Sequence, residues 1–339
     1  LQDLSTLDID GCNGLRSGHL REQLTELGSL LPRCTIYFTG PTDESTYTIS
    51  RFRALDLLHQ QQRPVLEYQH AHLTTNNHRG TLDGICVLPK EEQFACIEHD
   101  SHLVSLYSAR TGEVVKAINT GAAPMGLCHV PKVDGSSLLA CCANSTMVRI
   151  EGLHRDIVRK TSWTTPDTQT SMCWQPLQRV LYSGSTSGKL YAWDIDKGVE
   201  KACYDDHTDI IMKLISVDHL GNIVTASLDT TVNLWDSFTG TRTCTLTGHT
   251  KGVLSLAYNP GHRFLLSCGF DHDALVWSPF DSKLLHRLKG HRCALMGCHA
   301  VEGTSEFITG DVSGLFKLWD LRSPGSAVQT FTSEHEPGD

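Results

Sequence analysis

The chain has 339 residues, of which 40% are hydrophobic and 20% are charged, and its formal net charge is −9. This composition is typical of a globular protein with a buried core. No apolar run approaches the ~20 residues of a membrane helix, which argues against a membrane partner. Because non-specific nucleic-acid binding requires a basic face, the acidic balance also argues against a nucleic-acid partner.

The first residues, LQDLSTLDID, contain no Met and no basic-then-apolar signal region. We therefore expect a cytoplasmic protein and a sequence that is a piece of something longer. The thirteen cysteines are scattered, and several fall inside apolar stretches such as LLACCANS and LLSCGF. This usage predicts buried, reduced thiols rather than a disulfide framework.

The first predicted element is a helix near the N-terminus. Leucines recur at helical spacing through HLREQLTELGSLL, and Gly28 lies near the end of that stretch. We expect residues 1–31 to form a short helical segment that is separate from the structure that follows it.

The loop ahead of this helix resembles the calcium-binding loop of an EF-hand. Asp8 and Asp10 fit the first and third ligand positions, and Gly14 fits the seventh, which supplies a carbonyl. However, Cys12 replaces the fifth ligand and His19 replaces the carboxylate of the twelfth position. Two carboxylates and an imidazole make a poor cage for a hard cation, so we predict a degenerate EF-hand-like segment and no metal site.

Short β-strands separated by turn residues are predicted from residue 32 to residue 335, followed by a tail at 336–339. Three candidate strands come first, in the stretches RCTIYFTGPTDES, TYTISRFRA and PVLEYQHAH. An innermost strand is not evident in this part, so we expect it to form an irregular first unit of a repeat array.

A 42-residue repeat organises most of the chain after residue 81. Its clearest markers are Trp and His residues that return at this interval in four and three copies respectively. These markers are Trp193, Trp235, Trp277 and Trp319, with His207, His249 and His291. Two kinds of marker in one frame are not a chance arrangement, so we treat each copy as one structural unit.

Each copy contains four short segments that are rich in β-branched or aromatic residues, as in VLSLAYNP, RFLLSCGF, DALVWSP and LLHRLKG. The pattern resembles the WD40 repeat family, whose Gly-His and Trp-Asp signatures appear here in TGHTK and NLWD. A four-stranded period near 42 residues implies one blade of a β-propeller. We count six full blades from about Leu82 to Phe331 and, with the irregular unit before them, predict an all-β propeller of seven blades.

The WD40 resemblance also implies a buried side-chain network in the best copies. It joins a His to an acid and a hydroxyl, and it satisfies the indole N–H of the Trp. The residues that match it are His207, Thr225, Asp229, Trp235, His249, Ser267, Asp271, Trp277, His291, Thr309 and Trp319. In the last copy Ser313 stands where the acid is expected. Because the pattern repeats, we interpret these residues as structural.

The motifs of common enzymes are missing. GSTSG and GDVSG lack the spacing of a nucleophile elbow and lie at predicted turns of the repeat. The chain has no phosphate-binding loop, no CxxC pair and no HExxH motif. We therefore predict no enzyme activity, no catalytic residue, no cofactor and no small-molecule substrate.

A set of apolar residues shares one repeat position, six residues before the end of each predicted inner strand. Three of the five Met in the chain occur there. The apolar members of the set, and our candidates for partner binding, are Met125, Met212, Leu254 and Met296. Since Met adapts easily to different surfaces, the position suits a binding site at the mouth of the propeller channel. The alternative is that these side chains only fill the tapering core.

These observations predict a non-enzymatic scaffold that binds other proteins. An EF-hand-like segment that leads directly into WD40 repeats resembles a group of long ciliary and flagellar proteins. That resemblance implies a cytoplasmic protein of the ciliary or flagellar axoneme, with microtubule-associated or other cytoskeletal partners. Two alternatives stay open, namely a cytosolic adaptor for a ubiquitin-ligase or signalling complex, and a calcium-responsive regulator.

Overall fold

The structure is a computed structural model. It describes residues 82–98, 101–132, 135–153, 158–301 and 303–332, together with the backbone of two short strands nearer the N-terminus. The chain divides into two compact units, Leu1–Gln69 and His70–Asp339.

In the first unit, strand β1 (Thr6–Asp8) pairs in parallel with strand β2 (Thr35–Tyr37). Asp8 ends β1, whereas Asp10, Gly14 and the predicted N-terminal helix lie outside the described residues. Most of the predicted irregular blade also lies outside them, so the EF-hand-like segment and the seventh blade stay predictions.

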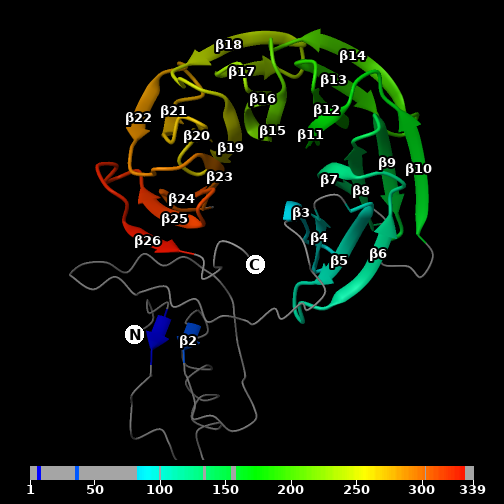
Figure 1. Cartoon of the computed structure of the whole chain (residues 1–339), viewed down its shortest axis with the longest axis horizontal. Helices are drawn as coiled ribbons and strands as arrows, with labels where there is room; N and C mark the ends of the chain where they lie inside the picture. Colours follow the sequence, from blue (N-terminus) through cyan, green and yellow to red (C-terminus); the bar gives the residue numbers. More distant parts are fainter. Residues whose placement is uncertain are drawn as a thin grey trace, which may run out of the picture. The chain divides into compact units, whose positions relative to one another are not determined.

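In the second unit, the described residues form six sheets of four antiparallel strands each, taken in chain order (Figure 1). Blade 1 contains β3 (Leu82–Leu88), β4 (Gln93–Glu98), β5 (Leu103–Ser108) and β6 (Val114–Asn119). Blade 2 contains β7 (Pro124–Lys132), β8 (Gly135–Cys142), β9 (Thr146–Glu151) and β10 (Arg159–Thr164). Blade 3 contains β11 (Gln169–Gln175), β12 (Val180–Ser185), β13 (Lys189–Asp194) and β14 (Val199–Asp205).

Blade 4 contains β15 (Ile211–Val217), β16 (Asn222–Ser227), β17 (Thr231–Asp236) and β18 (Thr241–Thr247). Blade 5 contains β19 (Val253–Asn259), β20 (Phe264–Gly269), β21 (Ala274–Trp277) and β22 (Leu284–Leu288). Blade 6 contains β23 (Leu295–Ala300), β24 (Glu306–Asp311), β25 (Leu315–Asp320) and β26 (Gln329–Thr332). The prediction of six four-stranded blades between Leu82 and Phe331 is confirmed.

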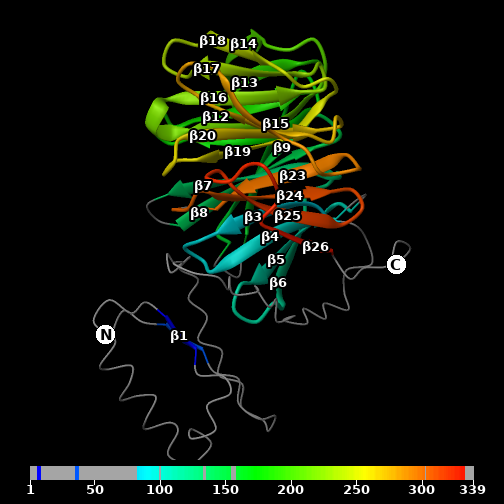
Figure 2. The same cartoon turned by 90° about the vertical axis from the view of Figure 1, so that its left-hand side faces the viewer.

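The blades follow one another around a common centre, with the first strand of each blade innermost and the fourth outermost (Figure 1). Figure 2 shows the same blades edge-on, with the outer strands β14 and β18 on one side of this unit and β6 on the other. A three-residue 3-10 helix, η2 (Asp218–Leu220), is the only helix in the described part of the chain. That part therefore contains no helix that is long and apolar enough to cross a membrane.

An acid follows three of the four Trp markers, and in blade 4 it closes the turn into the outer strand. In blade 4, the Asp236 carboxylate accepts hydrogen bonds from the backbone N–H groups of Phe238 (2.8 Å) and Thr239 (3.2 Å). Gly240 completes the turn at φ +66°, a left-handed conformation that a side chain would strain. The Trp is thus an anchor in the core, and the residue after it turns the chain back to start the last strand.

The core lies between blades rather than inside any one of them. One cluster joins Val224, Val232 and Leu234 of blade 4 to Leu256 and Trp277 of blade 5. Because a blade with a neighbour on either side is covered on both faces, its middle strands are buried along their whole length, as β20 is. The outer strands face solvent and alternate, as β14 does.

Blades 1 and 6 end the series, and each keeps an apolar face that no described blade covers. Ile85 and Val87 on β3 are both 63% exposed, whereas Leu256, the repeat equivalent of Ile85 in blade 5, is 3% exposed. On blade 6, Phe316 is 37% exposed where its equivalent in blade 5, Ala274, is 1% exposed. The same sequence pattern thus gives buried side chains wherever a neighbouring blade is present and exposed ones where none is described.

Candidate functional site

The His, hydroxyl and Trp markers of blade 5 meet in one buried cluster. His249 Nδ1 lies 2.8 Å from Asp271 Oδ2, and His249 Nε2 lies 2.7 Å from Ser267 Oγ. The indole Nε1–H of Trp277 donates to the same Ser267 oxygen at 2.8 Å. Both ring nitrogens, the hydroxyl and the indole N–H therefore have partners inside the blade. Gly248 belongs to the cluster as well, because a Cβ there would lie 2.8 Å from the Trp277 ring.

Blade 6 repeats this cluster with its acid in a different place. His291 Nε2 lies 2.8 Å from Thr309 Oγ1, which also accepts the indole N–H of Trp319 at 2.8 Å. The acid is Asp311, whose Oδ2 lies 2.7 Å from His291 Nδ1. Ser313, which stands at the expected acid position, donates to Asp311 Oδ1 instead. The acid position of the last copy is therefore two residues earlier than the repeat spacing predicts.

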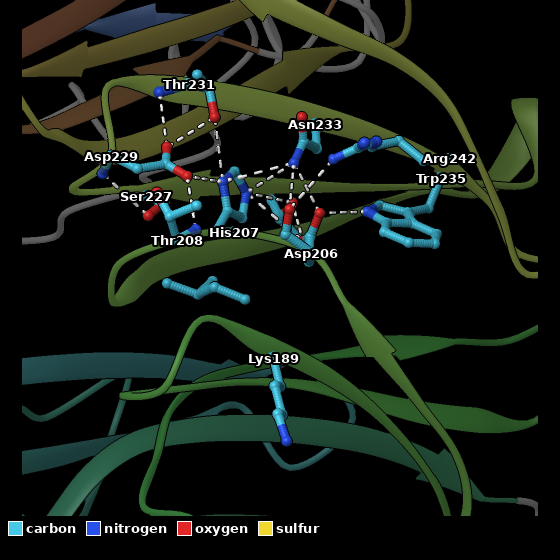
Figure 3. Close-up of polar contacts among 12 residues, drawn as sticks. Lys189, Asp206, His207, Thr208, Ser227, Asp229, Thr231, Asn233, Trp235 and Arg242 are labelled. Carbon is cyan, nitrogen blue, oxygen red and sulfur yellow. Dashed lines mark hydrogen bonds and ion pairs between the residues drawn. The ribbon is translucent and has the colours of Figure 1, made fainter.

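In blade 4 a second carboxylate joins the cluster (Figure 3). His207 Nδ1 lies 2.8 Å from Asp229 Oδ2, and its Nε2 lies 2.9 Å from Thr225 Oγ1, as the sequence predicts. However, the indole of Trp235 donates to Asp206 Oδ1 at 2.7 Å rather than to the hydroxyl. Asp206 occupies the place that Gly248 and Gly290 hold in the next two blades.

Both ring nitrogens of His207 have hydrogen-bond partners in blade 4. Nδ1 faces the carboxylate of Asp229, and Nε2 faces the hydroxyl of Thr225, which donates to Asp206 Oδ2 at 2.6 Å. His207 is therefore held between two carboxylates, whereas one carboxylate faces His249 in blade 5.

The acids of these clusters are kept ionised by their partners. Burial by itself raises the pKa of Asp229, but the hydrogen bond from Thr231 and the charge of His207 outweigh it and lower the pKa overall. For Asp311, burial is likewise outweighed by hydrogen bonds from Ser313 and His291, and the pKa is again lowered.

These clusters contain the residue types of catalytic triads, yet they hold the blades together. The side chains of His207, His249 and His291 are 0%, 1% and 1% exposed. A substrate has no access to such an imidazole, and every ring nitrogen already has a partner inside the sheet. The geometry therefore supports the structural interpretation of these residues.

The cysteines that the structure describes are free thiols, and most are buried. Burial raises the pKa of Cys86 and Cys96 to about 11 and that of Cys141 to about 12. Thiols with such pKa values stay protonated at neutral pH and are poor nucleophiles or metal ligands. Within the described ranges, no three His, Cys, Asp or Glu residues are grouped as metal ligands would be.

Every blade has a β-bulge at the repeat position that the sequence singles out for partner binding. The register of the inner strand shifts across one residue in all six blades. The residues within these shifts are Asp83, Met125, Thr170, Met212, Leu254 and Met296. A bulged residue leaves the regular ladder and is aimed differently from its neighbours, and bulges are frequent beside binding sites.

The bulged side chains differ in how far they are available to a partner. Met296 is 57% exposed and Met125 is 42% exposed, whereas Leu254 is only 9% exposed. Met212 is half-buried, and Thr170 Oγ1 donates to the carbonyl oxygens of Gly184 and Ile211. Of the four predicted contact residues, Met125 and Met296 therefore offer the most apolar surface, and Leu254 is packed in the core.

The family model for the WD domain, G-beta repeat, matches residues 240–278, which run from the end of blade 4 through Trp277 of blade 5. The repeated His–hydroxyl–Trp clusters and the radial blades agree with this match. The chain contains a WD40 repeat at residues 240–278. The WD40 match covers one repeat, and the structure extends the same architecture to the five other described blades.

Several curated proteins are similar to part of the chain. One is Cilia- and flagella-associated protein 337 B of Tetrahymena thermophila, 33% identical over 165 residues, which are 48% of this chain and 13% of the relative. Periodic tryptophan protein 2 homolog of Dictyostelium discoideum is 25% identical over 44% of this chain and 16% of its own length. Ribosome biogenesis protein YTM1 of Laccaria bicolor is 27% identical over 38% of this chain and 30% of its own length. The matched region is thus less than a third of each relative.

The blade 4 cluster predicts a large stability effect for Thr225→Val. The substitution keeps the side-chain shape but removes one buried hydrogen bond from Asp206 and one from His207. We expect the free energy of unfolding in urea to fall by about 2–4 kcal/mol. The matched control is Thr243→Val on the exposed strand β18, for which we expect a change within about 0.5 kcal/mol. Equal effects of the two substitutions would contradict the proposed role of the cluster.

The turn after Trp319 predicts a pH-dependent effect for Asp320→Asn. Burial raises the pKa of Asp320, but hydrogen bonds from Arg322 and Ser305 outweigh it and lower the pKa to about 2. Because the ordinary value of 3.8 is higher, the stabilisation is complete above pH 4 and is lost as the pH falls through 2. In denaturation series from pH 6 to pH 2, the difference in free energy of unfolding between the wild type and Asp320→Asn should therefore shrink. The exposed control Glu113→Gln should show no such trend. A loss of unfolding free energy that stays constant with pH would contradict this prediction.

Proposed function

We propose that this WD40 propeller is a non-catalytic scaffold that binds other proteins at the mouth of its channel. The observation that carries the proposal is the bulge of every inner strand, which displays the exposed Met125 and Met296 at the same repeat position. The buried His clusters support it, because their polar groups are used within the blades. A rigid disk with an adaptable apolar rim suits capture of protein segments.

We further propose that the partners belong to the ciliary or flagellar axoneme. The support is the 33% identity to a protein named as cilia- and flagella-associated. A second candidate is a role in ribosome biogenesis, because another relative carries that name. The adaptor hypothesis gains no specific support from the described blades, and the calcium hypothesis concerns a loop that lies outside them.

Proximity labelling tests the scaffold and its location together. We expect the full chain, fused to a biotin ligase in a ciliated cell, to label axonemal proteins that resist salt extraction. The Met212→Ser/Met296→Ser double variant should lose most of this labelling with little change in melting temperature, because Met296 is 57% exposed and Met212 is only half-buried. Leu177→Ser is the control, since Leu177 is 63% exposed beyond the opposite end of β11.

Each outcome of this experiment has a clear meaning. Nucleolar labelling would replace the axonemal proposal with the ribosomal one. A double variant that labels like the wild type would overturn the channel mouth as the binding site. If the double variant only melts at a lower temperature, its Met side chains fill the core and do not form a binding site.

We also propose that a seventh blade, supplied by the chain before Leu82, completes the ring. The exposed face of blade 1 carries Ile85 and Val87, and that of blade 6 carries Phe316, at positions that neighbouring blades bury elsewhere. The stretch from residue 32 to residue 81 is long enough for one 42-residue repeat.

Ring closure predicts that Ile85→Ser lowers the free energy of unfolding by at least about 2 kcal/mol, because a buried apolar side chain would become polar. Leu256→Ser, at the equivalent covered position, is the reference for a full effect. Val115→Ser is the control on the outer strand β6, where Val115 is 49% exposed. If Ile85→Ser lowers the free energy of unfolding as little as Val115→Ser does, no blade covers this face of blade 1.

A further inference from the structure

Blades 5 and 6 carry an apolar and basic surface at the end of the propeller where the bulges lie. Two kinds of segment form it, namely the loops that enter the inner strands and the turns between the second and third strands. Its residues, called here the blade 5–6 patch, are Lys251, Phe270, Arg292, Met296 and Val312.

Backbone hydrogen bonds hold these segments against each other. The N–H of Phe270 donates to the carbonyl of Gly252 at 3.0 Å, so this turn lies beside the loop of Lys251. In blade 6 the N–H of Val312 donates to the carbonyl of Ala294 at 3.0 Å, beside the loop that carries Arg292. Strands β19 and β20 both pack on β23, which brings the two pairs of segments side by side.

The apolar members of the patch are unusually accessible. Phe270 is 42% exposed, Met296 is 57% exposed and Val312 is 65% exposed. The turn of blade 3 has the polar residue Thr186 at the position of Phe270 and Val312. Three large apolar side chains that remain in water on adjacent loops are typical of a binding surface rather than of a solvated turn.

The basic members of the patch have no counter-charge among the residues that the structure describes. Lys251 and Arg292 are exposed, and neither forms an ion pair with the described residues. The acids in the neighbouring turns of these blades already interact with other residues. Asp271 and Asp311 are held by the buried imidazoles, and Asp273 pairs with Arg287 at 2.8 Å. The patch is therefore locally positive on a chain whose net charge is −9.

From this combination we infer that the blade 5–6 patch docks an acidic peptide segment of a partner protein, with apolar side chains between its carboxylates. The inference rests on the proposed scaffold function and names the chemistry of its partner. Charge complementarity selects an acidic segment, and the three apolar side chains require apolar groups on it. A polyanionic nucleic acid would match the two cations but would leave Phe270, Met296 and Val312 uncovered.

Fluorescence anisotropy with a defined probe tests the inference. The probe is a labelled synthetic peptide in which glutamates flank two phenylalanines, and the comparison peptide has every glutamate replaced by lysine. We expect the full chain to bind only the acidic peptide, with an affinity that falls as salt is added. Lys251→Glu/Arg292→Glu should weaken binding about tenfold or more.

The control is Lys201→Glu/Arg159→Glu, which changes the net charge equally on the exposed outer strands β14 and β10. It should leave the affinity within about twofold of the wild type, since both residues lie away from the patch. Equal weakening by the two double variants, or binding of both peptides alike, would overturn the inference. So would binding of a labelled oligonucleotide that is tighter than binding of the acidic peptide.

Proximity labelling with the same variants separates this inference from the scaffold proposal. If Met212→Ser/Met296→Ser abolishes labelling while Lys251→Glu/Arg292→Glu does not, the scaffold stands and the acidic partner is wrong. If both variants abolish labelling, both proposals are supported. If neither does, the channel mouth is not the binding site and both fail.

Discussion

Each blade has two apolar faces, and only another blade can cover them. The cluster that joins Val232 and Leu234 to Leu256 and Trp277 shows this dependence, because its members come from two sheets. The hydrophobic free energy that stabilises a blade is thus shared with its neighbours. A four-stranded sheet alone would leave both apolar faces in water, and Ile85 and Val87 show one such face at the end of the described series.

The buried polar clusters add order to this apolar packing. Ser267 and Thr309 each link an imidazole to an indole across the strands of one blade. Since an unpaired polar atom in such a place is costly, these hydrogen bonds favour the one arrangement of strands that pairs the imidazole and the indole. In blade 4 the same purpose is served by two acids, with His207 between Asp206 and Asp229.

Much of this architecture follows from the sequence because the repeat is regular. The 42-residue step places Trp277 and His249 correctly, since both are fixed by the core of one blade. The 42-residue spacing predicts the wrong partner where a residue at a different repeat position can make the same contact. Asp311 reaches His291 from the end of β24, and Asp206 reaches Trp235 from a position that usually holds glycine. Alignment of the copies would have marked Asp206 as an acid in a glycine column, but spacing alone does not reveal its contact.

The proposed binding surface could not be fully predicted from the sequence, and the reason is physical. The repeat gives the position of Met296 and Leu254 in the strand, but exposure depends on how far the neighbouring loops extend over each. Leu254 is covered and Met296 is not, although both lie in equivalent bulges. Phe270 and Val312 share one repeat position, but the residue type at that position varies from blade to blade, so the period does not predict an apolar surface there.

The Asp236 turn has a consequence for how such a chain can change over evolutionary time. All the hydrogen bonds that close it come from residues 236–240, within a single copy. A duplication or deletion of one whole unit would therefore carry its own chain reversal with it and leave the reversals on either side intact. Growth and loss of copies by recombination is consequently compatible with correct folding, provided that the apolar faces at the new junction fit each other.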